Sequence, residues 1–505
     1  MTRRAAALWL LLFAVYASTL GLDAFGSSDY AGDEPHYLLA AQSLVEDGDL
    51  DVKDDFAARE WREFSPAGLA PQAGEVKGRL REPHAGGLAV LAAPAYAIGG
   101  PTGVELLLAA LAALAITLAY RLALRVAPDP WALGGALAVG VCAPVLAHST
   151  SVYPELAAGA VLAGAALLAL ELDETVGRPR AFACFALLGL LPWLGLKFVP
   201  AGVVIGAYAA RSLYRARRRV LAVGSVEVAL FSVAFFVAIN EATYGGPSPY
   251  SAALPDEGAT DANGPLAYLE RAYRLVALLI DRDFGLLRWA PVFVLVFVGL
   301  WFTYRSRREL LARAVPQLRR RERTATMCAA AVAAHLLTAA FLAPTMYGPW
   351  FPPRYLVAGL VLTVPLVALG LRHVPRAGTA LALLSAAASL WLWLDVRVGG
   401  GGLVDPRPSA PLGPLTQLFP RFDDSAWPYA LAAAIGAVVV AGVALELRRN
   451  GDRGQRARAA FMAFLGTFSS TRCACPCARR SPRWPGACRR PGTACTGGPT
   501  CSTSS

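Results

Sequence analysis

The chain has 505 residues, of which 56% are hydrophobic and only 16% are charged, and its formal net charge is +11. Ordinary soluble domains carry roughly 25% charged residues, so the composition places this chain among polytopic membrane proteins. The arginines form short clusters between apolar runs and not a basic stripe with interleaved aromatic residues, which argues against nucleic acid as a partner.

The N-terminal sequence MTRR is followed by an apolar run that continues to Leu22. This run is longer than the core of a usual signal peptide, and no small-x-small cleavage site follows it. We therefore expect an uncleaved first transmembrane helix.

Runs close to the length of about 20 apolar residues that a spanning helix needs predict an all-α fold with about twelve transmembrane helices. We expect them at 5–22, 104–126, 131–148, 153–171, 180–196, 197–211, 220–240, 288–304, 325–343, 354–372, 377–395 and 428–446. The run 88–98 contains Pro94 and is too short to span, so it is either re-entrant or an extension of the second helix.

The arginine clusters predict the orientation of these helices. If the N-terminus is cytoplasmic, every Arg-rich cluster falls on the cytoplasmic side, as the positive-inside rule requires; the largest are at 211–219, 305–323 and 448–458. The outer side then receives the long first loop 23–87. We expect an integral protein of the cell (plasma) membrane with both termini in the cytoplasm.

Two outer segments have apolar residues at helical spacing. The sequence HYLLAAQSLVEDG, from His36, predicts a surface helix that follows Pro35, a residue suited to a first helical turn. The segment 266–289 predicts a second amphipathic helix, which leads into the next span. Both are either connectors that cap the bundle or direct contacts for a substrate.

The last part of the chain differs from the rest in composition. Residues 1–450 are the predicted transmembrane domain, and 451–505 are a basic, Cys-, Pro- and Ser-rich cytoplasmic tail. Its six cysteines lack a His and a second pair at zinc-site spacing, so we interpret the tail as disordered or frame-shifted. The other cysteines, Cys142, Cys184 and Cys328, are expected as buried hydrophobic residues.

Chemistry is expected where the first outer loop begins, at the adjacent carboxylates Asp33 and Glu34. One interpretation is general-base catalysis, in which a carboxylate takes the proton of an attacking hydroxyl. A second is a site for a divalent cation, Mg or Mn, held by Asp33 and Glu34 with His36. A third is an acidic outer surface without a further role.

Cationic groups on the same predicted face favour a site. Arg354 lies where a helix begins on the outer side, which suits a phosphate, although it could equally be an interfacial anchor. Lys197 and His84 lie at outer junctions and could also reach a phosphate. If the leaving group is a phosphate, one base and such cations suffice for group transfer.

Several blocks resemble the GT-C superfamily of polytopic glycosyltransferases, which use polyprenyl-phosphate sugars. The most specific are AGDEPHYLLAAQSL and YGPWFPPRYL; GRLREPHAGGLAVLAAPAYAIGG, VYPELAAG and LPWLGLKFVP are looser. The chain is similar in particular to bacterial members grouped with dolichyl-phosphate-mannose–protein mannosyltransferases and aminoarabinose transferases. The resemblance covers roughly residues 1–450. The block EPHAGG departs from it, because a second Pro before Gly is more usual there.

The resemblance implies a GT-C fold whose first outer loop forms the active site. Asp33 would be the catalytic base, and Glu34 would orient an acceptor or bind an ion. Arg354, Lys197 and His84 would bind the lipid phosphate, and His36, Tyr37 and Tyr355 complete the expected substrate-binding residues.

The expected reaction is the inverting transfer of a sugar from a polyprenyl-phosphate-linked donor to an acceptor hydroxyl on the outer face. The acceptor is a glycan, a lipid or a protein. One alternative is a transporter or flippase, for which Glu227 within a predicted helix is the best residue. Another is a glycan polymerase or ligase, whose chemistry would lie in a later outer loop.

Overall fold

The computed structural model describes residues 2–25, 28–66, 68–254, 265–306, 316–399, 401–404, 413–422 and 426–442. Within these residues the regular structure is helical, with isolated β-bridges and no named strand. The chain divides into a unit of residues 1–436 and a second unit of residues 437–505. The predicted tail 451–505 lies outside the described residues.

Seven of the described helical segments are long and apolar enough to cross a membrane. They contain α4 (Gly87–Ala123), α7 (Glu155–Glu174), α9 (Val199–Arg215), α10 (Arg219–Tyr244), α17 (Pro316–Phe341), α18 (Val357–His373) and α19 (Pro375–Arg397). Shorter apolar helices are α5 (Trp131–Gly140), Pro291–Arg305, which contains most of α15 (Val294–Ser306), and Ala426–Gly442. The two remaining predicted spans are occupied by α1 (Arg3–Ala17) and α8 (Arg178–Leu194). Each predicted span thus overlaps a helix, and the total of twelve crossings stays a prediction.

Two predicted helices are interrupted. The span predicted at 131–148 ends as α5 at Gly140 and resumes as α6 (Ala143–Ala147), because Cys142 is extended and Pro144 offers no N–H for a continuing helix. The amphipathic segment 266–289 is divided into α12 (Pro265–Glu270), α13 (Arg274–Ile280) and α14 (Leu286–Trp289). There the Asp281 carboxylate accepts the N–H groups of Asp283 and Phe284, both at 2.8 Å, and so ends α13 in a turn.

The run 88–98 extends the second predicted span, which was one of the two alternatives. It forms the first part of α4, and the helix is kinked at Gly99 and Gly100. Gly100 has a φ of +58°, which glycine adopts readily, and Pro101 follows directly. The kink lets one long helix pack on α1 with its second part and on the first loop with its first part.

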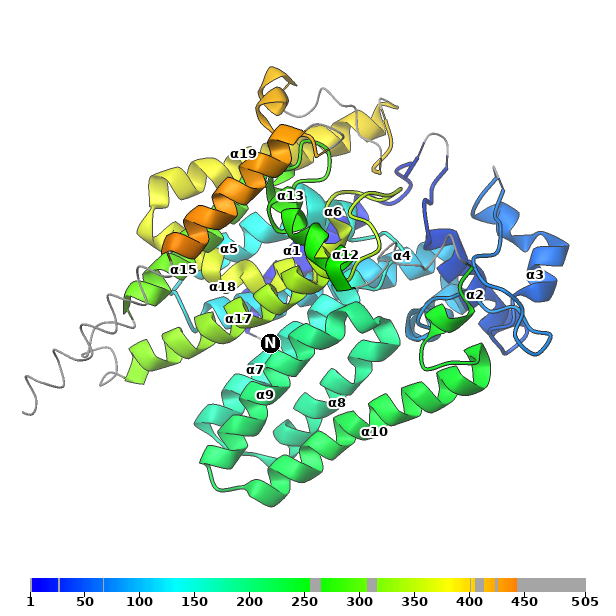
Figure 1. The fold of residues 1–505 in the computed structure, drawn as a ribbon, viewed down its shortest axis with the longest axis horizontal. Helices are drawn as coiled ribbons and strands as arrows, with labels where there is room; N and C mark the ends of the chain where they lie inside the picture. Colours follow the sequence, from blue (N-terminus) through cyan, green and yellow to red (C-terminus); the bar gives the residue numbers. More distant parts are fainter. Residues whose placement is uncertain are drawn as a thin grey trace, which may run out of the picture. The chain divides into compact units, whose positions relative to one another are not determined.

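The centre of the first unit is α18, whose first fifteen residues are all buried. It packs against α4, α5, α7, α15 and α17, as Figure 1 shows. Glycines allow this close approach: a Cβ added at Gly135 would lie 2.9 Å from Ala368 Cα, and one at Gly159 would lie 2.8 Å from Val361 Cγ2. Small residues at helix contacts are typical of packing in membranes.

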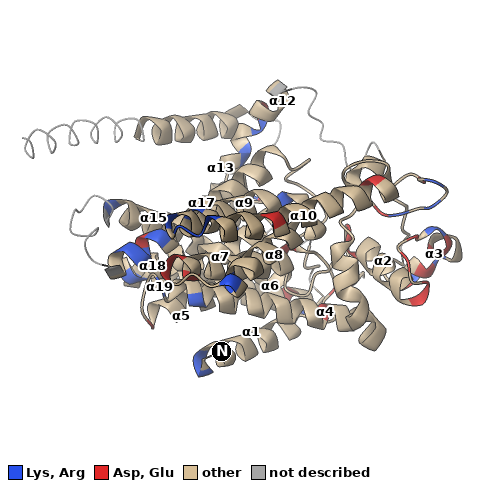
Figure 2. Ribbon diagram, turned by 90° about the horizontal axis from the view of Figure 1, so that it is seen from below, with Lys and Arg blue, Asp and Glu red and all other residues tan. Residues whose placement is uncertain are grey.

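The first loop contains α2 (Glu34–Glu46) and α3 (Lys53–Ala58). The predicted helix from His36 is confirmed as α2, which has Pro35 in its first turn and packs against α4. Nine of its thirteen residues are buried, so it is fixed to the bundle. Basic side chains gather around the ends of α15, α17 and α18, at the opposite end of the helices from α2 and α3 (Figure 2).

Candidate active site

A glycine turn positions Asp33. Gly32 has a φ of +62°, and a Cβ at this residue would lie 2.6 Å from Tyr153 Oη. The Asp33 N–H donates to that hydroxyl at 3.2 Å, and the hydroxyl donates to the Ala31 carbonyl at 2.9 Å. The turn therefore needs glycine both for its backbone and for the close approach of Tyr153.

Arg354 joins two carboxylates that are far apart in the sequence. Its Nη1 donates to Asp33 Oδ2 at 2.9 Å, and its Nε donates to Glu155 Oε1 at 2.9 Å. The side chains of Arg354 and Glu155 are 4% and 1% exposed, whereas that of Asp33 is 24% exposed. Buried charges persist only when they are paired, and Asp33 is the partner that remains accessible.

Lys197 completes a cluster of two cations and two carboxylates. Its Nζ donates to the same Glu155 oxygen at 2.6 Å. We call Asp33, Glu155, Lys197 and Arg354 the charged quartet; its formal charges sum to zero. An incoming anion therefore competes with the carboxylates for the cations.

Helix N-termini converge on the quartet. Asp33 is the N-cap of α2, and Glu155 is the first residue of α7. Lys197 and Arg354 lie in single 3₁₀ turns that lead directly into α9 and α18. The free N–H groups and the positive end of the dipole at a helix N-terminus favour an anion.

Aromatic rings enclose the Arg354 guanidinium. Its Cζ lies 3.7 Å from the centre of the Tyr153 ring, 5.0 Å from that of Trp350 and 5.9 Å from that of Tyr355. Lys197 Nζ lies 5.2 Å from the Tyr355 ring. The quadrupole of such rings stabilises a cation, so these residues hold both charges in the site.

The pKa of Asp33 reflects this arrangement. Burial would raise it, but the Arg354 guanidinium and its hydrogen bond, with His84 and His36 nearby, hold the pKa of the carboxyl well below its usual range. A base that is ion-paired in this way is weak. Its basicity increases when Arg354 turns to another anion.

Glu34 points away from Arg354, although it follows Asp33 directly. Its Oε2 accepts the Ala31 N–H at 2.9 Å and its Oε1 accepts the Val152 N–H at 2.7 Å. Burial raises the pKa of Glu34 to about 7 in spite of these two hydrogen bonds. The two adjacent carboxyl groups therefore differ in environment and in pKa.

The carboxylates do not fit the expected Mg or Mn site. Asp33 Oδ2 is bound by Arg354, and both oxygens of Glu34 accept backbone N–H groups. In the described part of the chain, no group of three or more His, Cys, Asp and Glu side chains is arranged to hold a metal ion.

His36, Tyr37 and His84 form a second polar group on α2 and the loop before α4. His36 Nδ1 lies 3.1 Å from Glu82 Oε1, and both side chains are 3% exposed. The His84 ring stacks on Tyr37 with 4.7 Å between centres. Burial lowers the pKa of His84 to about 4, although Asp33 opposes this shift. His84 is therefore neutral at pH 7, so it cannot serve as a permanent cation for a phosphate.

The structure brings together most of the residues expected from the sequence. Asp33, Lys197, Arg354 and Tyr355 meet in or beside the quartet, Glu34 lines a cavity next to it, and His36, Tyr37 and His84 surround the same end of α2. The site residues expected from the sequence do not include Tyr153 or Glu155, although Glu155 flanks a short outer loop on the same predicted face. Their signal was the block VYPELAAG, in which a lone Glu begins an apolar run.

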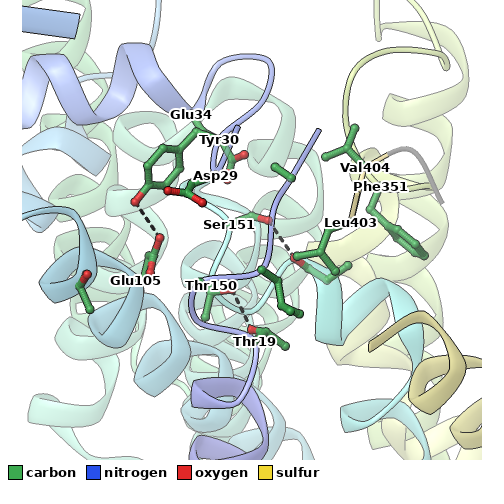
Figure 3. Close-up of a pocket in the computed structure, with 15 residues that line it drawn as sticks. Thr19, Asp29, Tyr30, Glu34, Glu105, Thr150, Ser151, Phe351, Leu403 and Val404 are labelled. Atoms are coloured by element: carbon green, nitrogen blue, oxygen red, sulfur yellow. Dashed lines mark hydrogen bonds between the residues drawn. The ribbon is translucent and has the colours of Figure 1, made fainter. Parts of the chain in front are cut away.

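A cavity lies beside Glu34 and occupies about 630 Å³, counting its open mouth. Residues from the end of α1, the first loop, α4 and the segment after α6 contribute to its wall. Figure 3 shows Tyr30 bonded to Glu105 and Thr19 bonded to Thr150 in its wall.

The chain is similar to solved structures of two proteins. ArnT from Cupriavidus metallidurans in the apo state is 16% identical over 78% of this chain and 70% of its own, with a TM-score of 0.48. ArnT from the same organism bound to undecaprenyl phosphate is 14% identical over 79% and 72%, with a TM-score of 0.49. Archaeal oligosaccharyltransferase AglB from Archaeoglobus fulgidus, in complex with an inhibitory peptide and a dolichol-phosphate, is 13% identical over 80% and 56%, with a TM-score of 0.44.

No protein-family model and no curated protein sequence matches the chain. The function of the chain is therefore inferred from the chemistry of the charged quartet.

Proposed function

We propose that this protein is a membrane glycosyltransferase that moves a sugar from a polyprenyl-phosphate carrier to an acceptor hydroxyl. The single observation that carries the proposal is Arg354 bound to Asp33 at 2.9 Å. A cation suited to a phosphate and a partly exposed carboxylate suited to act as a base lie in direct contact. Transfer from a phosphate needs these two functions side by side.

The donor phosphate binds Arg354 and Lys197 at the convergent helix N-termini and displaces Asp33 from Arg354. The pKa of Asp33 then rises, because its principal counter-charge has turned to the phosphate. The acceptor oxygen attacks the anomeric carbon while its proton passes to Asp33. The bond from that carbon to the phosphate oxygen breaks, and its electron pair stays on the phosphate, so the configuration inverts.

The total charge of the quartet and the donor phosphate is conserved during this step. The leaving phosphate gains one negative charge, and Asp33 loses one by protonation. Arg354 and Lys197 stabilise the charge that the phosphate acquires, with Glu155 holding both cations in place. Tyr153 and Tyr355 keep the cations oriented, and His36, Tyr37 and His84 complete the substrate-binding residues at the same end of α2.

We also propose the orientation that the arginine clusters predict. The quartet faces the outside of the plasma membrane, and both termini lie in the cytoplasm. The acceptor is a glycan, lipid or protein hydroxyl reached from that side. Glu227, the best residue for a transporter, is exposed on α10.

The test is sugar transfer in membranes that contain the wild type or Asp33→Asn, supplied with labelled polyprenyl-phosphate sugars, undecaprenyl carriers first. We expect transfer by the wild type and a loss of about 100-fold or more in Asp33→Asn, the usual contribution of a general base. Equal transfer by both proteins would refute the role of Asp33. Movement of labelled lipid between leaflets without transfer would establish a flippase instead.

A further inference from the structure

We propose that the cavity beside Glu34 is the acceptor subsite, and that it takes a sugar ring or other polyol through hydroxyl and amino groups that donate hydrogen bonds. That the ligand is the acceptor rests on the proposed function. The chemical class of the ligand follows from the hydrogen-bonding character of the cavity wall.

The hydroxyl groups of the wall have used their hydrogens within the protein. Thr19 donates to the Tyr16 carbonyl at 2.7 Å, so the contact of 2.9 Å between Thr19 and Thr150 leaves Thr150 as the donor. Ser151 donates to the Ala147 carbonyl at 2.8 Å. Each hydroxyl has one hydrogen, so these groups offer only lone pairs to the cavity.

The same is true of Tyr30, which donates to Glu105 Oε1 at 2.8 Å. Four of the five hydroxyl-bearing residues in the wall are therefore acceptors; the fifth, Thr102, is exposed at the cavity. The remaining polar side chains are the carboxyl groups of Asp29, Glu34 and Glu105, and none of the described lining residues is Lys, Arg or His. Acceptors predominate among the described lining residues, so the wall favours a ligand that donates hydrogen bonds.

Asp33 and Glu34 face surroundings of different charge, and this difference assigns the donor and the acceptor to different places. Asp33 faces the cations Arg354 and Lys197, whereas Glu34 lines a wall with three carboxyl groups. A phosphate is attracted to the first side, whereas the second side has no cation among its described lining residues. We therefore place the acceptor in the cavity and the carrier phosphate at Arg354 and Lys197.

Methyl glycosides that differ in one group test the ligand class directly. We would measure the thermal stabilisation of the full-length protein by methyl β-glucoside, methyl β-glucosaminide and methyl β-glucuronide. We expect the first two to stabilise the protein, the amino sugar more strongly, and the glucuronide to have no effect, because its carboxylate meets carboxylates.

Two variants test the site. In Glu105→Gln and in Asp29→Asn, the apparent affinity for the glucosaminide should fall by about tenfold, the loss of one charge-assisted hydrogen bond. Asp29 is exposed, so that variant should fold even if Glu105→Gln does not. Glu75→Gln is the matched control, because Glu75 is half-exposed and pairs with Lys53 outside the cavity.

Equal stabilisation by the glucuronide, or unchanged affinity in both variants, would overturn the assignment. Stabilisation by undecaprenyl phosphate, measured in the same samples, reports on Arg354 and Lys197 and not on the cavity wall. A failure of the proposed carrier chemistry is therefore seen separately from a failure of the acceptor subsite.

Discussion

At the scale of single residues, one guanidinium is shared between two carboxylates of different kinds. Glu155 is fully buried and also holds Lys197, whereas Asp33 is partly exposed and has Arg354 as its only ion-pair partner within 4 Å among the described residues. Displacing Glu155 would leave buried charges unpaired, which is costly. An incoming phosphate therefore replaces Asp33, the carboxylate that is needed as a base.

This competition predicts an unusual property of Asp33→Asn. Although the variant loses transfer, its affinity for undecaprenyl phosphate should rise by about tenfold, because the carboxylate that competes for Arg354 is gone. Binding to purified wild type, Asp33→Asn and Arg354→Ala would measure this, with Arg354→Ala expected to bind weakly. Weaker binding by Asp33→Asn would show that Asp33 does not compete with the phosphate.

Glu34 predicts a pH dependence of stability. Its pKa is raised from 4.5 to about 7 by burial, so the folded state holds a proton that the unfolded state releases above about pH 4.5. The contribution of Glu34 to the free energy of unfolding is therefore greatest below pH 4.5 and falls as the pH rises to about 7. Unfolding of Glu34→Gln in detergent should lose this slope, while Glu75→Gln should keep it; an unchanged slope in Glu34→Gln would contradict the prediction.

At the scale of elements, the site is made where helices begin. The starts of α2, α7, α9 and α18 meet at the quartet, and the break between α5 and α6 leads to the segment that carries Ser151 and Tyr153. Each helix is held by apolar packing further along its length. The charged residues are thus positioned by rigid elements, as a preorganised site requires.

The turn before α2 is the element most sensitive to substitution. Gly32→Ala should destabilise the protein by about 1–3 kcal/mol and reduce transfer, because the added Cβ meets Tyr153 Oη at 2.6 Å and the φ is +62°. Gly48→Ala is a control with a φ of +81° and open space around its Cβ. If both variants lost stability equally but kept transfer, the close approach to Tyr153 would not matter for the site.

At the scale of the whole molecule, the described Lys and Arg side chains gather around α15, α17 and α18, at the opposite end of the helices from α2 (Figure 2). The side of the membrane on which each end lies stays a prediction. A quartet at the outer end would use a lipid-linked donor and not a soluble nucleotide sugar. The orientation of the protein in the membrane can be tested without knowing the substrate.

Thiol labelling tests orientation and the tail together. A chain truncated after Leu465 loses the six tail cysteines, and the remaining three are buried; we expect unchanged expression and activity. In this background an impermeant thiol reagent should label Lys77→Cys in intact cells and Arg217→Cys only after permeabilisation. The reverse pattern would place the quartet in the cytoplasm, and loss of activity on truncation would give the tail a function.

The sequence by itself determined the positions of the helices and the elements of the site that lie next to each other in the chain. Apolar runs of spanning length are a local property, and so are the pair Asp33 and Glu34 and the placement of Arg354 before a helix. These features need no knowledge of the packing, because each depends on residues within about one helix length.

Only the tertiary structure decided which charges meet. Asp33, Glu155, Lys197 and Arg354 are as much as 321 residues apart, and it is the packing of α7 and α18 that places Glu155 on Arg354. The opposite directions of Asp33 and Glu34 also could not be read from their order, because the Val152 N–H that holds Glu34 comes from another segment. The chemistry of adjacent residues was set by neighbours distant in the chain.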